Sequence, residues 1–204
     1  METNDKQITD FLKVVNEQID NFEETVDEKA LDEACNIILE AEKNNGRVHI
    51  TGIGKPGHVS GYAASLFSSV GTPAYVLDGT EAIHGSSGQV KEGDVVIAIS
   101  NSGETTELMK TVNCLKENGA QIIALTGNSD SALAKSAKVC LVAKVSEEGD
   151  SLNKPPRASI LVEMLMLQLL SLLLQNKKDL TKEQYVKWHP GGKIGSSING
   201  GAQL

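Results

Sequence analysis

Apolar positions change their spacing along the chain, and each spacing predicts a different kind of element. Between residues 8 and 44 they recur every three or four positions, as in Phe11, Val15 and Ile19, which predicts two amphipathic helices. Five β-rich runs follow, over residues 48–51, 74–77, 95–99, 122–126 and 139–143. Helical segments are expected over residues 58–69, 104–117, 131–136 and 157–174.

This alternation predicts an α/β fold, a three-layer α-β-α sandwich around a five-stranded parallel sheet of the Rossmann-like kind. The run over residues 95–99 is apolar throughout, as expected of a central strand covered on both faces. No repeat or linker interrupts the pattern, so one domain is expected. Its parts would be N-terminal helices over residues 1–45, an α/β core over 46–178 and a tail over 179–204. Ligands of such sheets bind beyond the carboxyl ends of the strands.

Composition narrows the classes of partner. The formal charge of −8 gives no positive field that would collect nucleic acid or an anionic membrane, so neither is expected as a partner. The apolar stretch over residues 160–174 is shorter than the roughly 20 residues of a membrane span and contains Glu163 and Gln168, so a buried helix is expected. The start of the chain lacks a signal-peptide pattern, which favours the cytoplasm. Three widely spaced cysteines form no CxxC pair, and no metal site is expected.

The first loop with candidate chemistry is Gly52-Ile53-Gly54-Lys55-Pro56-Gly57, which fits the GxGxxG dinucleotide fingerprint. Asp78, 21 residues beyond Gly57, stands where a ribose-binding acid would be expected. Against this interpretation, the chain has no second domain for a substrate, and Lys55 places a full charge in the turn. A tight turn that needs glycines for close backbone approach is the plain structural alternative. A nicotinamide enzyme therefore stays open as one hypothesis.

The second loop, residues 100–107, follows the apolar central strand and leads into a helix. Its hydroxyls on Ser100, Ser102 and Thr105 can donate to a phosphate, Gly103 lets the backbone curl, and a helix start supplies free N–H groups. N-capping by Ser102 is the alternative, but it explains one hydroxyl and not three. We expect the phosphate-binding residues to be Gly54, Lys55, Ser100, Asn101, Ser102, Gly103 and Thr105.

Four segments together make the pattern more specific: residues 52–57, Glu81-Ala82-Ile83-His84-Gly85, residues 100–104 and Trp188-His189-Pro190-Gly191-Gly192. In this order they resemble the sugar isomerase (SIS) family, and within it the arabinose 5-phosphate isomerases without their paired CBS modules. Three places depart from that group. Pro56 and Ser86 stand where it usually has Ser and Asp, and residues 156–159 read Pro-Arg-Ala-Ser where it has Pro-Thr-Ser-Ser.

The resemblance implies interconversion of D-arabinose 5-phosphate and D-ribulose 5-phosphate, without a cofactor, in a homotetramer built as a dimer of dimers. It also implies the site residues Lys55, His84, Glu104, Glu148 and His189. Isomerisation through an enediol needs a base near two adjacent carbons and groups that stabilise charge on the oxygens, and these side chains suit both tasks.

Each of these side chains also has a plainer interpretation. Glu104 could be a first-turn acid of its helix, and Glu148 a solvated member of an acidic run. His84 and His189 could mark turns, and Lys55 could be a solvated loop cation. His49 is expected to be packed inside a strand, and His58 to cap a helix.

Two further predictions concern the class of protein and its assembly. A sugar-phosphate sensor without catalysis is the alternative to the isomerase, since a sensor needs the phosphate loop but not the acid and base set. The helix over residues 157–174 is apolar on nearly every face, so part of it is expected to pack against another subunit. His189, on a tail beyond the sheet, is expected to serve the site of a neighbour.

Overall fold

The core of the fold is a five-stranded parallel sheet. A computed structural model describes residues 4–191. The strands are β1 (Val48–Gly52), β2 (Ala74–Val76), β3 (Val95–Ile99), β4 (Gln121–Thr126) and β5 (Val139–Val142). Their order in the sheet is β2-β1-β3-β4-β5, and each neighbouring pair is parallel. The predicted α/β class and parallel sheet are confirmed.

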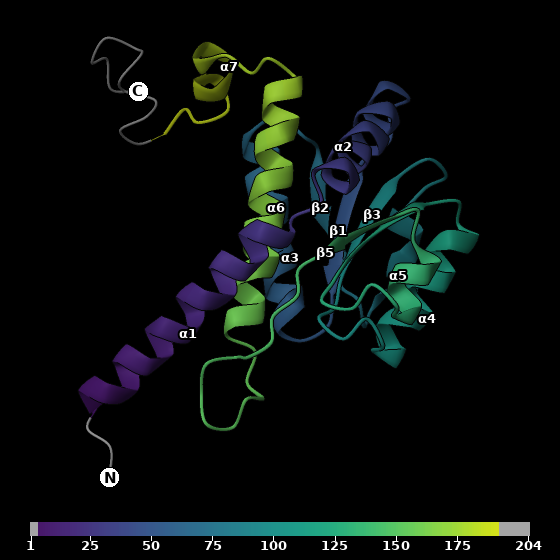
Figure 1. The fold of residues 1–204 in the computed structure, drawn as a ribbon. Coiled ribbons are helices and arrows are strands. Elements are labelled where there is room, and N and C mark those ends of the chain that lie inside the picture. Colours follow the sequence, from purple (N-terminus) through teal and green to yellow (C-terminus); the bar gives the residue numbers. More distant parts are fainter. Residues whose placement is uncertain (1–3, 192–204) are drawn as a thin grey trace.

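Helices cover both faces of the sheet, which makes the predicted three layers (Figure 1). On one face α2 (Glu28–Lys43), α3 (Lys55–Ser69) and α6 (Ala158–Lys177) share a core with the side chains of Ile50, Ile97 and Leu125. On the other face α4 (Thr106–Glu117) and α5 (Ala132–Ser136) pack against Ala98 and Ala124. Successive residues of β3 therefore serve opposite cores, and all five are fully buried, because a central strand has no solvent face.

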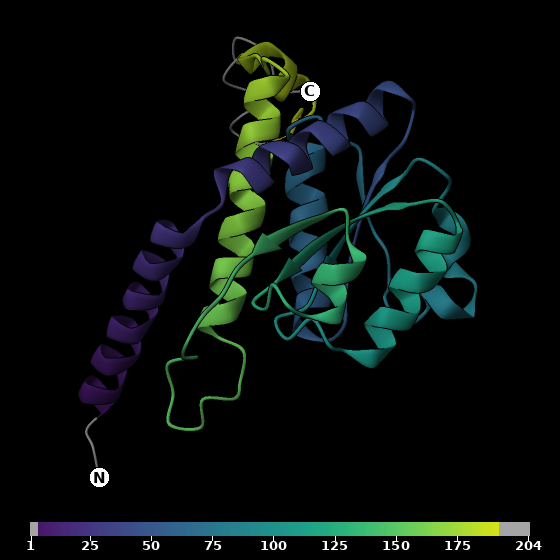
Figure 2. The same cartoon turned by 45° about the vertical axis from the view of Figure 1, so that its right-hand side comes forward.

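The remaining helices lie outside these layers. Helix α1 (Asn4–Thr25) projects away from the sheet beside the first part of α6, and α7 (Lys182–Lys187) follows the far end of α6 (Figures 1 and 2). Two 3₁₀ turns, Ala82–His84 and Ser86–Gln89, follow β2. The sequence did not predict α7 or the 3₁₀ turns.

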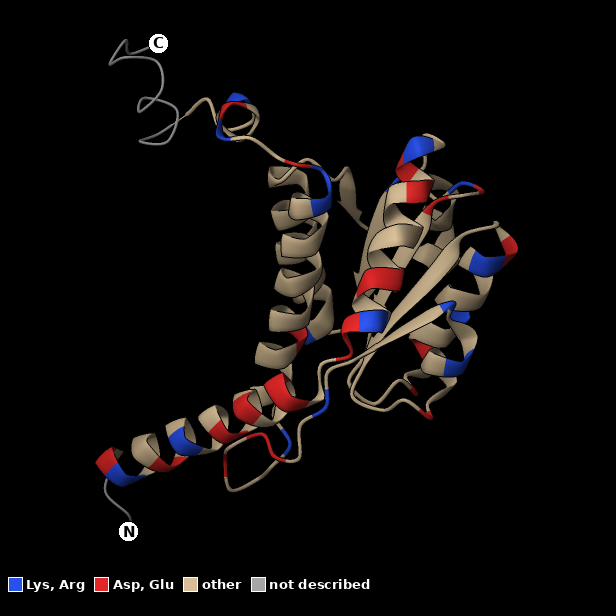
Figure 3. Ribbon diagram, turned by 45° about the horizontal axis from the view of Figure 1, so that its top comes forward, with Lys and Arg blue, Asp and Glu red and all other residues tan. Residues whose placement is uncertain are grey.

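Helix α6 is the most apolar element. Figure 3 shows it free of charge over most of its length, whereas α1 carries charges of both signs. By length and composition α6 could cross a membrane, but half of its most apolar window is buried inside the protein. Leu161 and Leu172 on its outer side remain 38% and 49% exposed. The predicted buried helix is therefore found, with an apolar strip left open.

A buried polar cluster fastens the amino ends of β1 and β3. The carboxylate of Asp94, 2% exposed, accepts from the amides of Arg47 and Lys91 at 2.8 and 2.9 Å and lies 3.1 Å from Nε2 of His49. His49 is 1% exposed, as expected for a packed strand residue. Burial lowers the pKa of His49, against the opposing effect of Asp94. This cluster lies at the opposite edge of the sheet from the loops that follow β1 and β3.

Candidate functional site

The two loops with candidate chemistry leave the sheet side by side. In the register of β1 with β3, Gly52 faces Ile99, so residues 53–54 and residue 100 follow at the same level. From here the chain turns through α3 to β2 on one side and through α4 to β4 on the other. Such a divergence between neighbouring parallel strands opens a crevice at their carboxyl ends, which is where ligands of these sheets bind.

Close contacts of the backbone explain why the first loop contains glycines. A Cβ at Gly52 would lie 2.8 Å from the Pro56 ring, and one at Gly57 would lie 3.0 Å from the Gly52 carbonyl oxygen. Gly54, the N-cap of α3, has a φ of 70° and makes no side-chain capping bond. The tight-turn interpretation thus accounts for the fingerprint by itself. Lys55 begins α3 with its side chain exposed at this edge.

Asp78 is already engaged. Its Oδ1 accepts from the amide and hydroxyl of Thr80 at 2.8 and 2.7 Å and from the amide of Glu81 at 3.1 Å. The Thr80 hydroxyl and these amides hold the pKa of Asp78 below its ordinary value. The carboxylate thus shapes the turn that leads to His84, a structural role that the dinucleotide interpretation did not anticipate.

The second loop is built from its own hydroxyls. Ser100, 5% exposed, accepts from the amide of Gly103 at 3.1 Å, and its Oγ lies 3.1 Å from Oγ1 of Thr105. The exposed Ser102 accepts from the amide of Glu104 at 3.2 Å. Gly103 has a φ of 65°, and a Cβ there would strike Ser131, so glycine is required. Hydrogen bonds within the loop hold its shape, and the side chain of Ser102 is left exposed.

The N-terminus of α4 is open. Its N-cap is Thr105 and not Ser102, and Thr105 makes no side-chain capping bond. Within residues 4–191, no acceptor is found for the amides of Thr106, Glu107 and Leu108. Free amides at a helix start, together with the positive end of the helix dipole, favour an anion. The predicted phosphate-binding residues Ser100, Asn101, Ser102, Gly103 and Thr105 belong to the loop that leads into this start.

Glu104 lies two residues before α4 and turns toward a different helix. Its Oε1 accepts from the amide of Ala132 at 2.8 Å, at the first residue of α5. The expectation of a first-turn acid of its own helix is therefore wrong, because the loop continues to Thr105 before the helix begins. The exposed carboxylate stays beside the open N-terminus of α4.

Glu148 is not the solvated surface residue that its acidic neighbours suggested. It is 8% exposed, and its Oε2 accepts from the amides of Arg157 and Ser159 at 2.7 and 3.1 Å. It therefore caps α6, the helix that begins at Ala158. The sequence hid this role because the capped residues come nine and eleven positions later.

The loop that contains Glu148 is fastened from outside by α1. Oε1 of Gln18, a residue 4% exposed, accepts from the amide of Ser146 at 2.8 Å and from its hydroxyl at 3.1 Å. On the other side of Glu148, a Cβ at Gly149 would lie 2.9 Å from the ring of Phe11. Gln18 was not among the predicted site residues, and only the fold brings it here.

The histidines are spread over the molecule. His84 ends the 3₁₀ turn after β2 and is exposed, on a segment that contacts α4. His58 is exposed in the first turn of α3. His189 lies beyond α7, where its Nδ1 is 2.7 Å from the carbonyl oxygen of Tyr185 and its ring stacks on the Tyr185 ring at 4.0 Å.

His189 is far from the other predicted residues of its own chain. Glu148 caps the first residues of α6, and α7 follows the last, so the 20 residues of α6 separate them by about 30 Å. Trp188, the neighbour of His189, packs on Gly71, which lies just before β2 and therefore near the amino ends of the strands. Figure 1 shows α7 at the opposite end of α6 from the loop with Glu148. Lys55, His84, Glu104 and Glu148 share the carboxyl edge of the sheet, and His189 does not.

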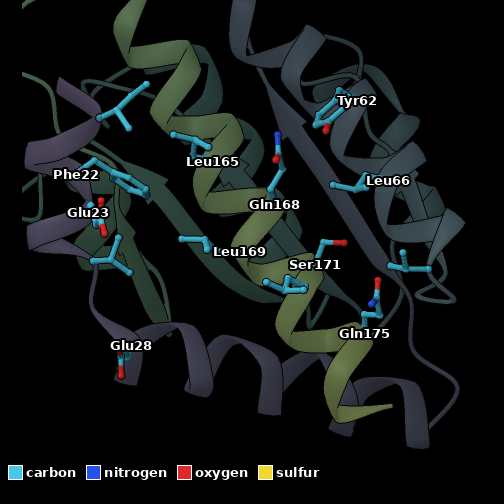
Figure 4. A pocket seen from close by; sticks show the side chains of 14 residues that line it. Phe22, Glu23, Glu28, Tyr62, Leu66, Leu165, Gln168, Leu169, Ser171 and Gln175 are labelled. Atoms are coloured by element: carbon cyan, nitrogen blue, oxygen red, sulfur yellow. The ribbon is translucent and has the colours of Figure 1, made fainter. Parts of the chain in front are cut away.

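Two grooves lie away from the phosphate loop, and a third lies between α1 and the loop of Glu148, where Phe11, Asp150 and Arg157 line it. One of about 710 Å³ runs between α1, α3 and α6 and is lined mainly by apolar side chains such as Phe22, Leu66 and Leu169 (Figure 4). Polar side chains that line this groove include Glu23, Glu28 and Ser171. Within residues 4–191, no group of three or more His, Cys, Asp or Glu side chains is placed to hold a metal ion.

Comparison with known proteins shows the family to which this chain is similar. A family model described as the SIS domain matches residues 42–173. The arabinose 5-phosphate isomerase KdsD of Francisella tularensis is 36% identical over 182 residues, which cover 89% of this chain and 55% of the relative. The chain thus spans about half the length of the curated relatives it matches.

Two solved structures share the fold at higher coverage. One, from Listeria monocytogenes and described as a candidate sugar-phosphate isomerase, has a TM-score of 0.86 at 27% identity and covers 94% of this chain and 100% of its own. The other, c3406 of E. coli CFT073 in complex with arabinose 5-phosphate, has a TM-score of 0.77 at 34% identity, with coverage of 93% and 100%.

Proposed function

Because this chain belongs to the SIS-domain family, we propose that it binds a phosphosugar at the carboxyl edge of its sheet and interconverts the aldose and ketose forms. The observation that supports this best is the open N-terminus of α4, where free amides and the hydroxyls of Ser102 and Thr105 surround a place for a dianion. The net charge of −8 offers no general attraction, so these local donors and Lys55 would hold the phosphate.

For the substrate we propose D-arabinose 5-phosphate, converted to D-ribulose 5-phosphate. KdsD of F. tularensis, at 36% identity, is named for that sugar, and a structural relative at 34% identity is described in complex with the same compound. A related pentose or hexose phosphate would fit the same phosphate loop, because that loop would bind the phosphate group and not the sugar.

The proposed chemistry moves one proton between two adjacent carbons. A base removes it from C2 of the open-chain aldose, an enediol forms, and the same proton returns at C1 to leave the ketose. Glu104 and Glu148, at the carboxyl edge of the sheet, are the carboxylates that we propose for this transfer, and His84 would exchange a proton with the sugar oxygens. Lys55 would stabilise negative charge that develops on those oxygens.

His189 would join the site from a second subunit. It lies about a helix length, some 30 Å, from Glu148 of its own chain. The exposed apolar side chains of Ile8, Leu12 and Leu172 and the groove between α1, α3 and α6 offer a surface for a second copy. We propose the homotetramer, a dimer of dimers, on this basis.

The test is an activity screen over pentose and hexose phosphates that begins with arabinose 5-phosphate. We expect turnover with at least one sugar, and at least a hundredfold loss of kcat in Glu104→Gln and Lys55→Met, because general acid or base catalysis contributes about 10²–10⁴. Glu117→Gln, an exposed acid at the opposite end of α4, is the matched control. No turnover on any sugar would contradict the enzyme.

A second candidate is a sensor that binds the phosphosugar without reaction. The observation that favours it is that both candidate carboxylates already cap helices, Glu104 at α5 and Glu148 at α6. Saturable binding of a sugar phosphate, weakened in Ser102→Ala and accompanied by no turnover, would support the sensor.

A further inference from the structure

A carboxyl group with no partner lies in the middle of the protein. Glu163 of α6 is 1% exposed, and neither of its side-chain oxygens has a hydrogen-bond partner within the described chain. Buried polar groups in folded proteins are nearly always hydrogen-bonded, and an exception calls for an explanation. Burying an unpaired carboxylate would cost so much that the group takes up a proton instead.

The position of Glu163 on α6 connects it with Glu148. Ser159, one turn before Glu163, is fully buried, and its hydroxyl also lacks a partner within the described chain. The amide of Ser159 donates to Oε2 of Glu148 at 3.1 Å. Residues four apart lie on the same helix face, about one 5.4 Å turn from each other. Two carboxyl groups therefore share the buried start of α6.

Little else near this position is charged. The buried side chains through which α2 and α3 pack against α6 are mainly apolar; the hydroxyl of Ser60 on α3 donates to the carbonyl oxygen of Pro56. The ion pairs between α6 and α2, Lys177 with Asp32 and Lys178 with Glu42, lie at the opposite end of α6. From α1 comes the neutral Gln18, already bonded to Ser146. The guanidinium of Arg157 is paired with Asp150 at 2.7 Å and is half exposed.

The two carboxyl groups cannot both be ionised at low cost. Burial, and secondarily the charge of Glu148, raises the pKa of Glu163 to about 8. At neutral pH Glu163 is then the protonated member of the pair. Oε2 of Glu148 accepts both helix amides, and its Oε1 is left for other donors.

We infer that Glu163 is a positioning residue: a neutral acid that donates a hydrogen bond to Oε1 of Glu148 and leaves that carboxylate as the one charged member of the pair. This rests on the proposed function in one respect, that Glu148 takes part in the proton transfer. Glu163 keeps its own proton throughout, while the substrate proton moves from C2 to Glu148 and from Glu148 to C1. Ionisation of Glu163 would place a second charge beside Glu148 and remove the donor.

The first test needs no activity. A folded-state pKa above the ordinary value means that the stability contributed by neutral Glu163 is complete below about pH 4.5 and is lost as the pH rises to about 8. The melting temperature of Glu163→Gln relative to the unaltered chain should therefore rise steadily from pH 5 to pH 8. Glu147→Gln, its exposed counterpart in the loop of Glu148, should show no such trend. A difference for Glu163→Gln that is constant with pH would overturn the neutral acid.

The pair itself is tested by combining Glu163→Gln with Glu148→Gln. If the two side chains interact, their effects on the melting temperature at pH 7.5 will not add. Additive effects would mean that Glu163 acts alone, and the inference would fail. This measurement gives an answer even if no sugar is turned over, in which case the proposed function fails separately.

The second test separates positioning from packing. Gln keeps a side-chain N–H that can donate to Glu148, whereas Met fills a similar volume without a donor. We expect Glu163→Met to lower kcat at least tenfold more than Glu163→Gln at pH 7. Glu163→Gln should also remove the fall of kcat/KM above about pH 8. If the two variants have equal kcat, and kcat/KM still falls above about pH 8 in Glu163→Gln, Glu163 contributes only to packing.

Discussion

At the scale of single residues, the serines of the second loop differ in what they already bind. Ser100 is buried and bonded within the loop, whereas Ser102 is exposed and accepts only the amide of Glu104. Ser102→Ala should therefore weaken binding of a sugar phosphate about tenfold, the loss of one hydrogen bond to a charged group, without lowering the melting temperature. Calorimetric titration with arabinose 5-phosphate would measure the affinity.

Two other serine substitutions serve as comparisons for Ser102→Ala. Ser100→Ala should lower both the affinity and the melting temperature, because Gly103 loses an acceptor inside the loop. Ser65→Ala, on the exposed side of α3, should change neither. Unchanged affinity in Ser102→Ala would place the phosphate elsewhere.

Residue roles were predictable where they depend on adjacent positions. The hydroxyls and Gly103 of the second loop follow from a strand, a glycine and a helix start that are consecutive in the sequence. The roles of Glu148 and Gln18 depend on contacts across 9 and 128 positions, so no local pattern contains them. Glu163 was visible only as an interruption in an apolar run, because a buried acid and a surface acid look alike in a sequence.

At the scale of elements, the side chain of Gln18 hydrogen-bonds the N-terminal helix α1 to the loop before α6. Gln18→Ala would leave the amide and hydroxyl of Ser146 without their acceptor. We expect a loss of about 1–3 kcal/mol in the free energy of unfolding, measured with denaturant. Gln7→Ala, exposed on the same helix, should cost less than about 0.5 kcal/mol. Equal effects of the two substitutions would mean that the link does not stabilise the fold.

The elements themselves were largely predictable. All five strands were expected within one residue of their ends, because a covered parallel strand reads as a short apolar run. Helix starts were less accurate: α4 begins at Thr106 and not at residue 104, since the loop hydroxyls first bond to one another. Helix α7 was missed because its residues Lys182–Lys187 have little apolar periodicity, and it depends on its Thr181 capping box.

At the scale of the whole molecule, His189 lies beyond the opposite end of α6 from Glu148. If His189 serves a neighbour, a mixture of His189→Ala and Glu104→Ala subunits should recover activity, because some interfaces then pair an intact His189 with an intact Glu104. The expected recovery is up to about a quarter of the original activity for random pairing in dimers with two shared sites. The measurement is the rate after exchange of two separately inactive variants.

Subunit exchange must be verified for this result to count. Light scattering at micromolar concentration should give an oligomer, as the exposed apolar side chains of α1 and α6 suggest. A monodisperse monomer, or a verified exchange without recovery, would contradict shared sites. Each variant alone provides the baseline.

The packing of Trp188 on Gly71 also has an optical consequence. Trp188 is the single tryptophan among 204 residues, so excitation at the red edge of protein absorption reports on one indole, next to His189. Trp188 is 46% exposed. Its ring packs directly on the backbone of Gly71, which has no side chain. The colour and polarisation of its emission therefore follow the docking of this segment alone. The protein contains an intrinsic label at the point where its tail meets the body.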